Sequence, residues 1–158
     1  MPQLSNYTYD EITIGQTATY SKLIAAQDIQ LFAIVSGDVN PVHLDAAFAA
    51  TTPFKECIAH GMLSAAIISA AIAMELPGPG TIYLGQSLRF CLPVKAGDTI
   101  TVALNVTDKK DKRRVVTLDC KVFNQHEQLV VTGTAEVMAP KEKLHLERPH
   151  LPQVQIED

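Results

Sequence analysis

The stretch Ala59-His-Gly-Met-Leu-Ser-Ala-Ala-Ile-Ile-Ser-Ala-Ala-Ile-Ala-Met-Glu-Leu76 is apolar on nearly every face of the helix that it predicts. Such a helix cannot lie on a surface, because it has no polar side to turn toward water. Its apolar run from Gly61 to Met74 is shorter than the roughly 20 residues that a bilayer span needs. We therefore expect a buried helix and no membrane association, with Pro77-Gly-Pro-Gly80 ending the helix sharply.

The second half of the chain changes to the two-residue period of half-buried strands. Residues 100–106 alternate between large apolar side chains and more polar ones. Similar runs cover residues 82–90, 116–122 and 129–138, and residues 17–24 add a strand from the start of the chain. We expect the four later strands to form an antiparallel meander. A curved sheet wrapped around the apolar helix buries both elements, so the sequence predicts an α+β hot-dog fold.

Two shorter helical patterns precede the apolar helix. Residues 25–35 repeat apolar side chains at helical spacing, and Asp45 precedes an alanine-rich run that ends before Pro53. Asp45 fits the N-cap of this second helix, which explains the residue without a catalytic role. Residues 141–158 mix charge with proline and show no period, so we expect an extended or partly disordered tail behind a single domain of residues 1–140.

The charge of this 158-residue chain argues against a nucleic-acid surface, because the formal net charge is −4 at pH 7. One basic cluster lies between two predicted strands, at Lys109, Lys110, Lys112, Arg113 and Arg114. We expect these residues to form a solvated hairpin loop, with attraction of an anionic ligand as the alternative.

The cysteines and the start of the chain indicate the compartment. Cys57, Cys91 and Cys120 are odd in number and have no paired spacing, so we expect reduced thiols. Residues 1–10 are polar and lack the apolar core of a secretory signal. Both observations favour a cytoplasmic protein.

The segment Ser36-Gly-Asp-Val-Asn-Pro-Val-His43 sets a carboxylate and an imidazole five residues apart across a turn. Its glycine, asparagine and proline are turn residues, which would hold Asp38 and His43 on a structured loop. A carboxylate accepts hydrogen bonds and a neutral imidazole offers one donor and one acceptor, so the pair could orient a water and move its protons. The alternative is that Asp38 only caps the turn and His43 is a satisfied loop histidine.

Metal and nucleophile chemistry have weaker support in the sequence. Asp38, His43 and His60 could be imagined as metal ligands, but their spacing matches no ligand motif and the cysteines are not grouped with them. No serine or cysteine lies in a recognisable nucleophile elbow. We therefore expect no metal site.

Three stretches carry a resemblance to a known family. They are Phe32-Ala-Ile-Val-Ser-Gly-Asp-Val-Asn-Pro-Val-His-Leu-Asp45, Ala59-His-Gly-Met-Leu63 and Leu76-Pro-Gly-Pro-Gly-Thr-Ile-Tyr-Leu-Gly-Gln86. In this order they resemble the (R)-specific enoyl-CoA hydratases, or MaoC-like hydratases, which have the hot-dog fold. With Arg89-Phe90 and Pro93-Val94, the likeness extends over most of residues 12–139.

The resemblance implies a reaction and its catalytic pair. The family adds water across the double bond of a trans-2-enoyl-CoA to give an (R)-3-hydroxyacyl-CoA, without a metal or redox cofactor. Asp38 and His43 match the family's catalytic positions. The hypothesis is that they hold the water together, that His43 withdraws a proton as oxygen attacks the β-carbon, and that Asp38 helps to return a proton to the α-carbon.

Four further residues have roles that the sequence leaves open. The backbone N–H of Gly61, at the start of the buried helix, is the candidate donor to the thioester oxygen, although glycine could simply ease helix entry. Ser69 aligns with a family serine near the pair, or else bonds its own helix backbone. Asn40 either holds the loop or contacts the site. His60 is expected to be a structural or packing histidine without a catalytic role.

The expected partners are an acyl-CoA thioester and a second copy of the chain, because members of the family commonly pair into a homodimer and exposed sheet edges need protection. Two other functions remain open on the same fold. One is an acyl-thioester hydrolase or a carrier-protein dehydratase, and the other is a non-catalytic acyl-CoA-binding protein.

Overall fold

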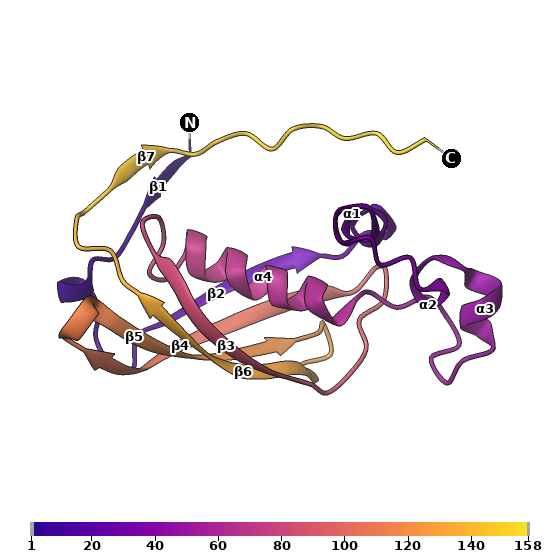
Figure 1. The fold of residues 1–158 in the computed structure, drawn as a ribbon, viewed down its shortest axis with the longest axis horizontal. Coiled ribbons are helices and arrows are strands. Elements are labelled where there is room, and N and C mark those ends of the chain that lie inside the picture. The colour runs from indigo at the N-terminus through magenta and orange to yellow at the C-terminus, as the bar shows by residue number, and fades with distance from the viewer. Residues whose placement is uncertain (1, 158) are drawn as a thin grey trace.

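The computed structural model describes residues 2–157 and confirms the predicted α+β hot-dog architecture (Figure 1). In these residues a five-stranded antiparallel sheet curves around one long helix, α4 (Gly61–Met74). The strands are β2 (Thr17–Leu23), β3 (Ile82–Phe90), β4 (Thr99–Lys110), β5 (Val115–Phe123) and β6 (Leu129–Met138). Within this part of the chain, no helix is long and apolar enough to cross a membrane.

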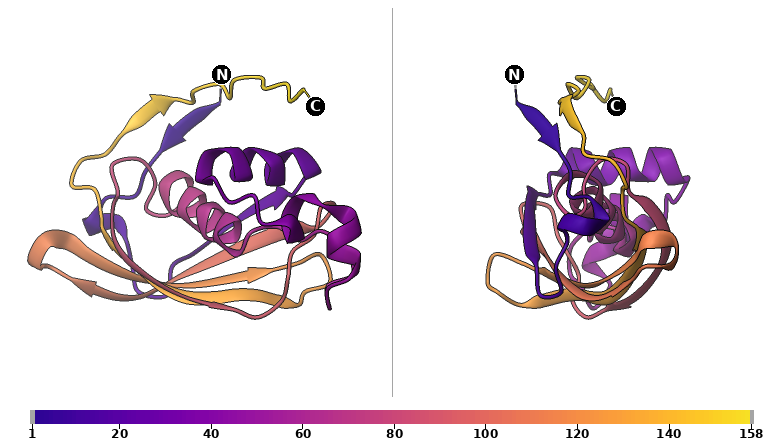
Figure 2. Two further views of the ribbon diagram at one scale, coloured as in Figure 1. Left: turned by 45° about the vertical axis from the view of Figure 1, so that its right-hand side comes forward. Right: turned by 90° about the vertical axis from the view of Figure 1, so that its left-hand side faces the viewer.

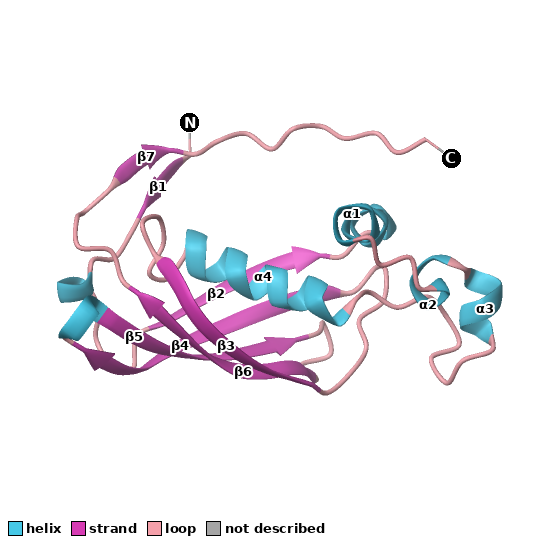
Figure 3. Cartoon of the chain, in the orientation of Figure 1, coloured by secondary structure: helices cyan, strands magenta, loops and turns pink. Residues whose placement is uncertain are grey.

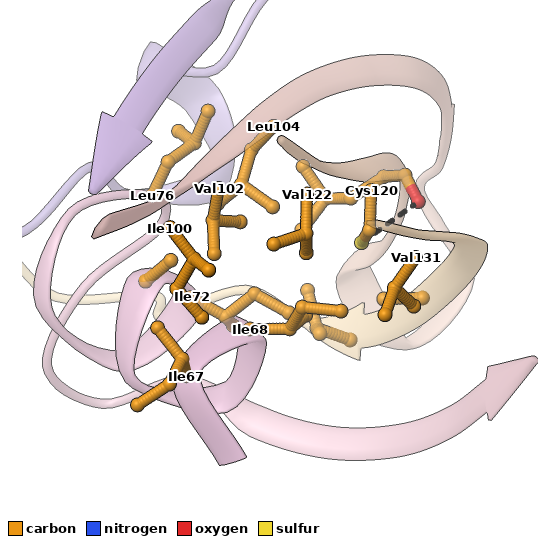
Figure 4. Packing of buried hydrophobic residues seen from close by; sticks show 14 of the residues in the cluster. Ile67, Ile68, Ile72, Leu76, Ile100, Val102, Leu104, Cys120, Val122 and Val131 are labelled. Atoms are coloured by element: carbon orange, nitrogen blue, oxygen red, sulfur yellow. Dashed lines mark hydrogen bonds between the residues drawn. The ribbon is translucent and has the colours of Figure 1, made fainter. Parts of the chain in front are cut away.

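Helix α4 forms the centre of the core. Ile68 and Ile72 lie toward the alternating buried residues of the sheet, such as Val102 and Val122 (Figure 4), and Ile67 is also buried. Fully burying one such side chain stabilises the fold by about 1.5–3 kcal/mol. The sheet and the helix therefore supply each other's hydrophobic surface, as the apolar run predicts. The burial is not complete, however, because Met62, Ala66 and Ala73 of α4 are exposed.

The order of the strands corrects one expectation from the sequence. The sheet runs β2-β4-β5-β6-β3, so only β4, β5 and β6 form a meander, and β3 pairs with β6 and not with β4. The connection of residues 91–98 is too long for a tight hairpin, and it is tied elsewhere, since Ala59 N–H donates to the Val94 carbonyl at 2.7 Å. This connection carries the chain from β3, at one edge of the sheet, to β4, which lies next to the opposite edge strand β2.

Three helices gather at one end of the sheet and form an overhang there (Figures 2 and 3). They are α1 (Ala26–Ser36), α2 (Pro41–Leu44) and α3 (Ala46–Ala50). Asp45 caps α3 as predicted, because its Oδ1 accepts from the Phe48 N–H at 3.0 Å. The overhang contains the loop that carries Asp38 and His43.

The two ends of the chain meet in a small second sheet. β1 (Gln3–Ser5) pairs with β7 (His145–Glu147), so part of the extended tail is tied to the N-terminal segment. Buried Asn6 stabilises this junction, since its side chain accepts from the Leu144 N–H at 3.0 Å and donates to the carbonyls of Pro79 and Glu142.

The basic cluster is less solvated than the sequence suggests. It joins β4 to β5 through a short 3-10 turn, η2 (Lys112–Arg114), and the 3-10 turn η1 (Tyr9–Glu11) lies beside it. Lys109 Nζ donates to the Ile12 carbonyl at 2.7 Å and lies 4.2 Å from the centre of the Tyr9 ring. Arg114 Nε donates to the Ala139 carbonyl at 3.1 Å. These two charges therefore hold neighbouring segments together.

Replacing Gly133 should test the pairing of β3 with β6. A Cβ at this position would lie 1.8 Å from the Ser87 carbonyl oxygen, so Gly133→Ala must separate the two strands. We expect a loss of about 3 kcal/mol in the free energy of unfolding, measured in urea. Gly85→Ala is the matched control, because its Cβ would meet no atom within 4 Å. Equal stability of the two variants would contradict this strand pairing.

Candidate active site

The loop that follows α1 is fixed by its own hydrogen bonds. Gly37 ends the helix in the left-handed conformation (φ 77°), which glycine adopts without strain, and its N–H donates to the Ala33 carbonyl. Ser36 Oγ accepts from the Asp38 N–H at 3.1 Å. Asp38 Oδ1 in turn accepts from the Asn40 N–H at 3.1 Å. The Asp38 carboxylate is therefore held with its second oxygen, Oδ2, directed away from the turn.

Asn40 starts the short helix that carries His43. Its Oδ1 accepts from the Val42 N–H at 3.2 Å, and Pro41 occupies the first helical position, where its missing N–H has no consequence. Asn40 therefore caps α2 and holds the loop in this conformation. The helix presents the His43 ring to the loop of Asp38.

The hydrogen bond of His43 determines which ring nitrogen carries a proton. His43 Nδ1 lies 2.8 Å from the Ile58 carbonyl, which can only accept, so Nδ1 carries the hydrogen and Nε2 offers a lone pair. Nε2 lies 3.8 Å from Asp38 Oδ2, too far for a direct hydrogen bond. The His43 side chain is 10% exposed and that of Asp38 is 49% exposed. A water molecule between the two atoms could bond to both and still reach a ligand.

A second histidine, His60, lies against the pair, which the sequence did not predict. Its ring is 3% exposed and stacks on the His43 ring, with centroids 3.7 Å apart and 22° between the planes. His60 Nε2 lies 3.0 Å from the backbone carbonyl of Asp38 and 3.9 Å from Asp38 Oδ2. Its sequence signals were its place immediately before the apolar helix and its presence in the stretch Ala59-His-Gly-Met-Leu63, which carries the family resemblance.

The three side chains form a cluster whose ligand atoms lie within 4.8 Å of one another. His60 Nε2 must carry a hydrogen to bond the Asp38 carbonyl, which removes its lone pair from metal binding. Of the atoms that approach one another in this cluster, His43 Nε2 and Asp38 Oδ2 then keep a lone pair for a shared ligand, fewer than the three protein ligands that a catalytic zinc ion takes. The donor set fits water better than a metal.

Gly61 is the first residue of α4, and its N–H belongs to the first turn, whose donors have no partner within the helix. His60 precedes it as the N-cap and makes no side-chain bond to that turn. A Cβ on Gly61 would lie 2.9 Å from the Phe90 ring, so the residue has little room for a side chain. The start of α4 therefore offers backbone donors directly beside the His60 ring.

Ser69 lies farther along α4. It follows Gly61 by eight residues, which is about 12 Å along a helix axis. Among residues 2–157 its hydroxyl has no hydrogen bond to Asp38 or His43. A supporting role for Ser69 stays a prediction from the family resemblance.

Two cavities border the first turn of α4. The smaller one, of about 290 Å³, is lined by His60, Gly61, Ser64 and Phe90 among others. The larger one, of about 530 Å³, is lined by Phe32, Met62, Ala65, Ala66, Leu84 and Leu88, with Tyr83 and Gln86. The apolar walls of the larger cavity suit a hydrocarbon chain.

Two ionisable groups near the larger cavity stay neutral. Partial burial raises the pKa of Tyr83 to about 12, and its hydroxyl donates to Gln86 Oε1. Burial likewise raises the pKa of the Cys120 thiol to about 11. Neither a phenolate nor a thiolate nucleophile is therefore present there near neutral pH.

The features described so far are a hot-dog sheet around a central helix and an overhanging loop that carries an aspartate and a histidine. Together they are typical of the hot-dog hydratase and dehydratase class. Residues 10–126 match the family described as MaoC like domain, and the chain belongs to this family.

Its relatives include named hydratases. The chain is 46% identical over 129 residues to the (R)-specific enoyl-CoA hydratase of Aeromonas caviae, covering 82% of this chain and 96% of that protein. It is also 46% identical over 134 residues to the (R)-specific enoyl-CoA hydratase of Rhodospirillum rubrum, covering 84% of this chain and 91% of that protein. Among solved structures, R-hydratase PhaJ1 from Pseudomonas aeruginosa, in the unliganded form, superposes with a TM-score of 0.94 at 59% identity, over 99% of this chain and 100% of that one.

Proposed function

We propose that this protein is an (R)-specific enoyl-CoA hydratase, which adds water to a trans-2-enoyl-CoA to form an (R)-3-hydroxyacyl-CoA. One observation supports the site assignment above the others, namely the 3.8 Å gap between His43 Nε2, an acceptor, and Asp38 Oδ2. Such a gap suits one water molecule bonded to both groups. The similarity to two hydratases at 46% identity supports the reaction and its (R) product.

His43 acts as the general base in this proposal. Its Nε2 takes a proton from the water while the water oxygen bonds to the β-carbon of the enoyl group. The π electrons of the double bond move toward the thioester, which becomes an enolate. Asp38 orients the water and helps to return the proton from the His43 imidazolium to the α-carbon, which completes the addition of one water molecule.

The enolate requires a donor at the thioester oxygen. Gly61 N–H is the proposed donor, since it lies at the positive end of the α4 dipole and directly follows His60. The larger apolar cavity, which begins at Met62, is the proposed place for the acyl chain. Ala65 and Ala66 line this cavity, and their small side chains leave it open.

We also infer that two copies pair through β3. Both β2 and β3 are edge strands, but their exposed side chains differ. The exposed residues of β2 are mostly Thr and Ser, whereas Ile82, Tyr83, Leu84 and Phe90 are exposed on β3. An exposed apolar edge favours addition of another strand, and two-fold pairing would cover it.

The extent of the hydratase unit and its location are further proposals. The match to the family covers residues 10–126, and β6, the last strand of the large sheet, ends at Met138; together these support a unit of residues 1–140 with 141–158 as an appended tail. Cys57, Cys91 and Cys120 are free thiols, which suits the reducing cytoplasm.

Hydration should be measured as loss of the enoyl thioester absorbance with crotonyl-CoA and with a medium-chain enoyl-CoA. We expect conversion to the (R)-3-hydroxy product, and a fall in kcat of about 10²–10⁴-fold in Asp38→Asn and His43→Ala. Asp45→Asn is the matched control, because an amide oxygen still caps α3. His126→Ala, in an exposed turn, is the control for histidine removal.

Other outcomes of this assay identify other functions. Rapid release of free thiol would identify a thioesterase and contradict the proposal. Ligand binding by a folded protein without hydration at any pH would identify an acyl-CoA-binding protein. Turnover of a carrier-protein thioester alone would identify a carrier-protein dehydratase.

Gly61→Pro removes the proposed oxyanion donor without removing the helix. Proline is favoured at the first helical position, and the preceding His60 already has an extended backbone. Gly61→Ala is the control, since it adds the same Cβ beside Phe90 but keeps the N–H. We expect kcat of Gly61→Pro to lie about 10²–10³-fold below that of Gly61→Ala. Equal activity of the two variants would exclude this donor.

The oligomeric state can be measured by light scattering. We expect twice the 17.2 kDa mass of the chain, and we expect Leu84→Lys on β3 to shift the protein toward monomer. Leu23→Lys, which changes an exposed leucine on the other edge strand, should leave the dimer intact. A monomeric parent protein, or dissociation caused by Leu23→Lys alone, would contradict pairing through β3.

A further inference from the structure

His60 joins the catalytic loop to the start of the central helix. It occupies the N-cap position of α4, but its side chain does not bond the helix. It turns instead to the backbone carbonyl of Asp38, 22 positions earlier, at 3.0 Å from Nε2. Because a carbonyl only accepts, Nε2 carries the hydrogen and donates it. The backbone of Asp38 is therefore held by His60, a residue that does not belong to the loop of Asp38.

The segment that contains His60 also holds His43. The Ile58 carbonyl accepts from His43 Nδ1 at 2.8 Å, and the Ile58 N–H donates to the Val42 carbonyl at 3.2 Å. The His60 ring covers one face of the His43 ring at 3.7 Å. Residues 58–60 thus bond the backbone of one member of the pair and the side chain of the other.

A packing role alone does not explain an imidazole at this position. His60 Nδ1 has no hydrogen-bond partner, and among residues 2–157 it is the buried side-chain nitrogen or oxygen that lacks one. An unsatisfied buried acceptor is unfavourable by about 1–3 kcal/mol. A phenyl ring would avoid this loss and could still stack on His43 and contact Phe32, whose centroid lies 4.9 Å away. What phenylalanine cannot supply is the donor to Asp38.

We propose that His60 is a positioning residue for hydration, and that it sets the gap between His43 Nε2 and Asp38 Oδ2. Its Nε2–H fixes the Asp38 backbone, and its ring fixes the plane of His43. The water between the two groups is then bound in one geometry. This role rests on the proposed hydratase function, and it assigns no proton transfer to His60 itself.

Two substitutions separate the donor from the ring. His60→Gln keeps an N–H at a similar reach and loses the stack, whereas His60→Phe keeps the stack and loses the donor. We expect kcat for crotonyl-CoA to fall about 10²-fold in His60→Phe, because a displaced catalytic group loses its alignment. KM should stay within about threefold, since substrate binding is not altered. His60→Gln should recover at least about tenfold of that loss in kcat.

A loss of global stability must be distinguished from a loss of position. Val106→Ala, in the buried face of β4, serves as the control, because it lowers the free energy of unfolding by removing core methyl groups far from the loop. Its kcat should equal that of the parent protein. If His60→Phe lowers only the unfolding midpoint and leaves kcat unchanged, or if His60→Gln is as inactive as His60→Phe, the positioning role is wrong.

Hydrogen exchange provides a readout that needs no activity. The N–H groups of Asn40 and Val42 are bonded within the loop, to Asp38 Oδ1 and Asn40 Oδ1. We expect both amides to exchange faster in His60→Phe and to recover protection in His60→Gln, with β-sheet amides unchanged. A parent protein without hydratase activity would refute the proposed function, whereas unchanged exchange in His60→Phe would refute the role of His60.

Discussion

Helix α4 has no polar face, and the rest of the structure depends on covering it. Its buried side chains, including Leu63, Ile68 and Ala71, need contact along the whole length of the helix. A flat sheet cannot provide that contact, so the five strands curve around the helix. The helix begins beside the overhang, where His60, which precedes the helix, contacts Asp38 and His43. The same burial that stabilises the core therefore also positions Gly61, the proposed oxyanion donor.

Local features of this fold could be predicted from the sequence, because their causes are local. The two-residue period identified the strands, and Gly37, Asn40 and Pro41 identified a structured turn, since each has its own backbone preference. The neighbour of β3 could not be predicted in this way. Pairing of β3 with β6 depends on two distant contacts. The connection after β3 is held at Val94 by the Ala59 N–H, and Gly133 of β6 lacks the Cβ that would meet the Ser87 carbonyl of β3.

The candidate site likewise contains residues that the local sequence predicts and one residue that it does not. The closeness of Asp38 and His43 was predictable because five residues and a turn separate them, whereas their catalytic role was predicted from the family resemblance. His60 was missed because its contacts with them depend on how the segment before α4 packs against the loop, and no local period reports such a contact. One sequence signal was a polar, ring-bearing residue at an N-cap position where serine, threonine, aspartate or asparagine is usual. Ser69, which the resemblance names, lies two turns along α4 from Gly61, and its supporting role stays a prediction.

The unlike edges of the sheet limit how the molecule can assemble. A strand edge that attracts another copy can start a chain of additions, unless each addition removes the attraction. Here the apolar side chains are on β3, and β2 at the far edge offers threonine and serine to water. Two copies joined at β3 would expose only their β2 edges, so a third copy would find no apolar strand to join. A single asymmetry in side-chain polarity would thus make the proposed pairing self-terminating and keep a ten-stranded dimer from growing into a fibre.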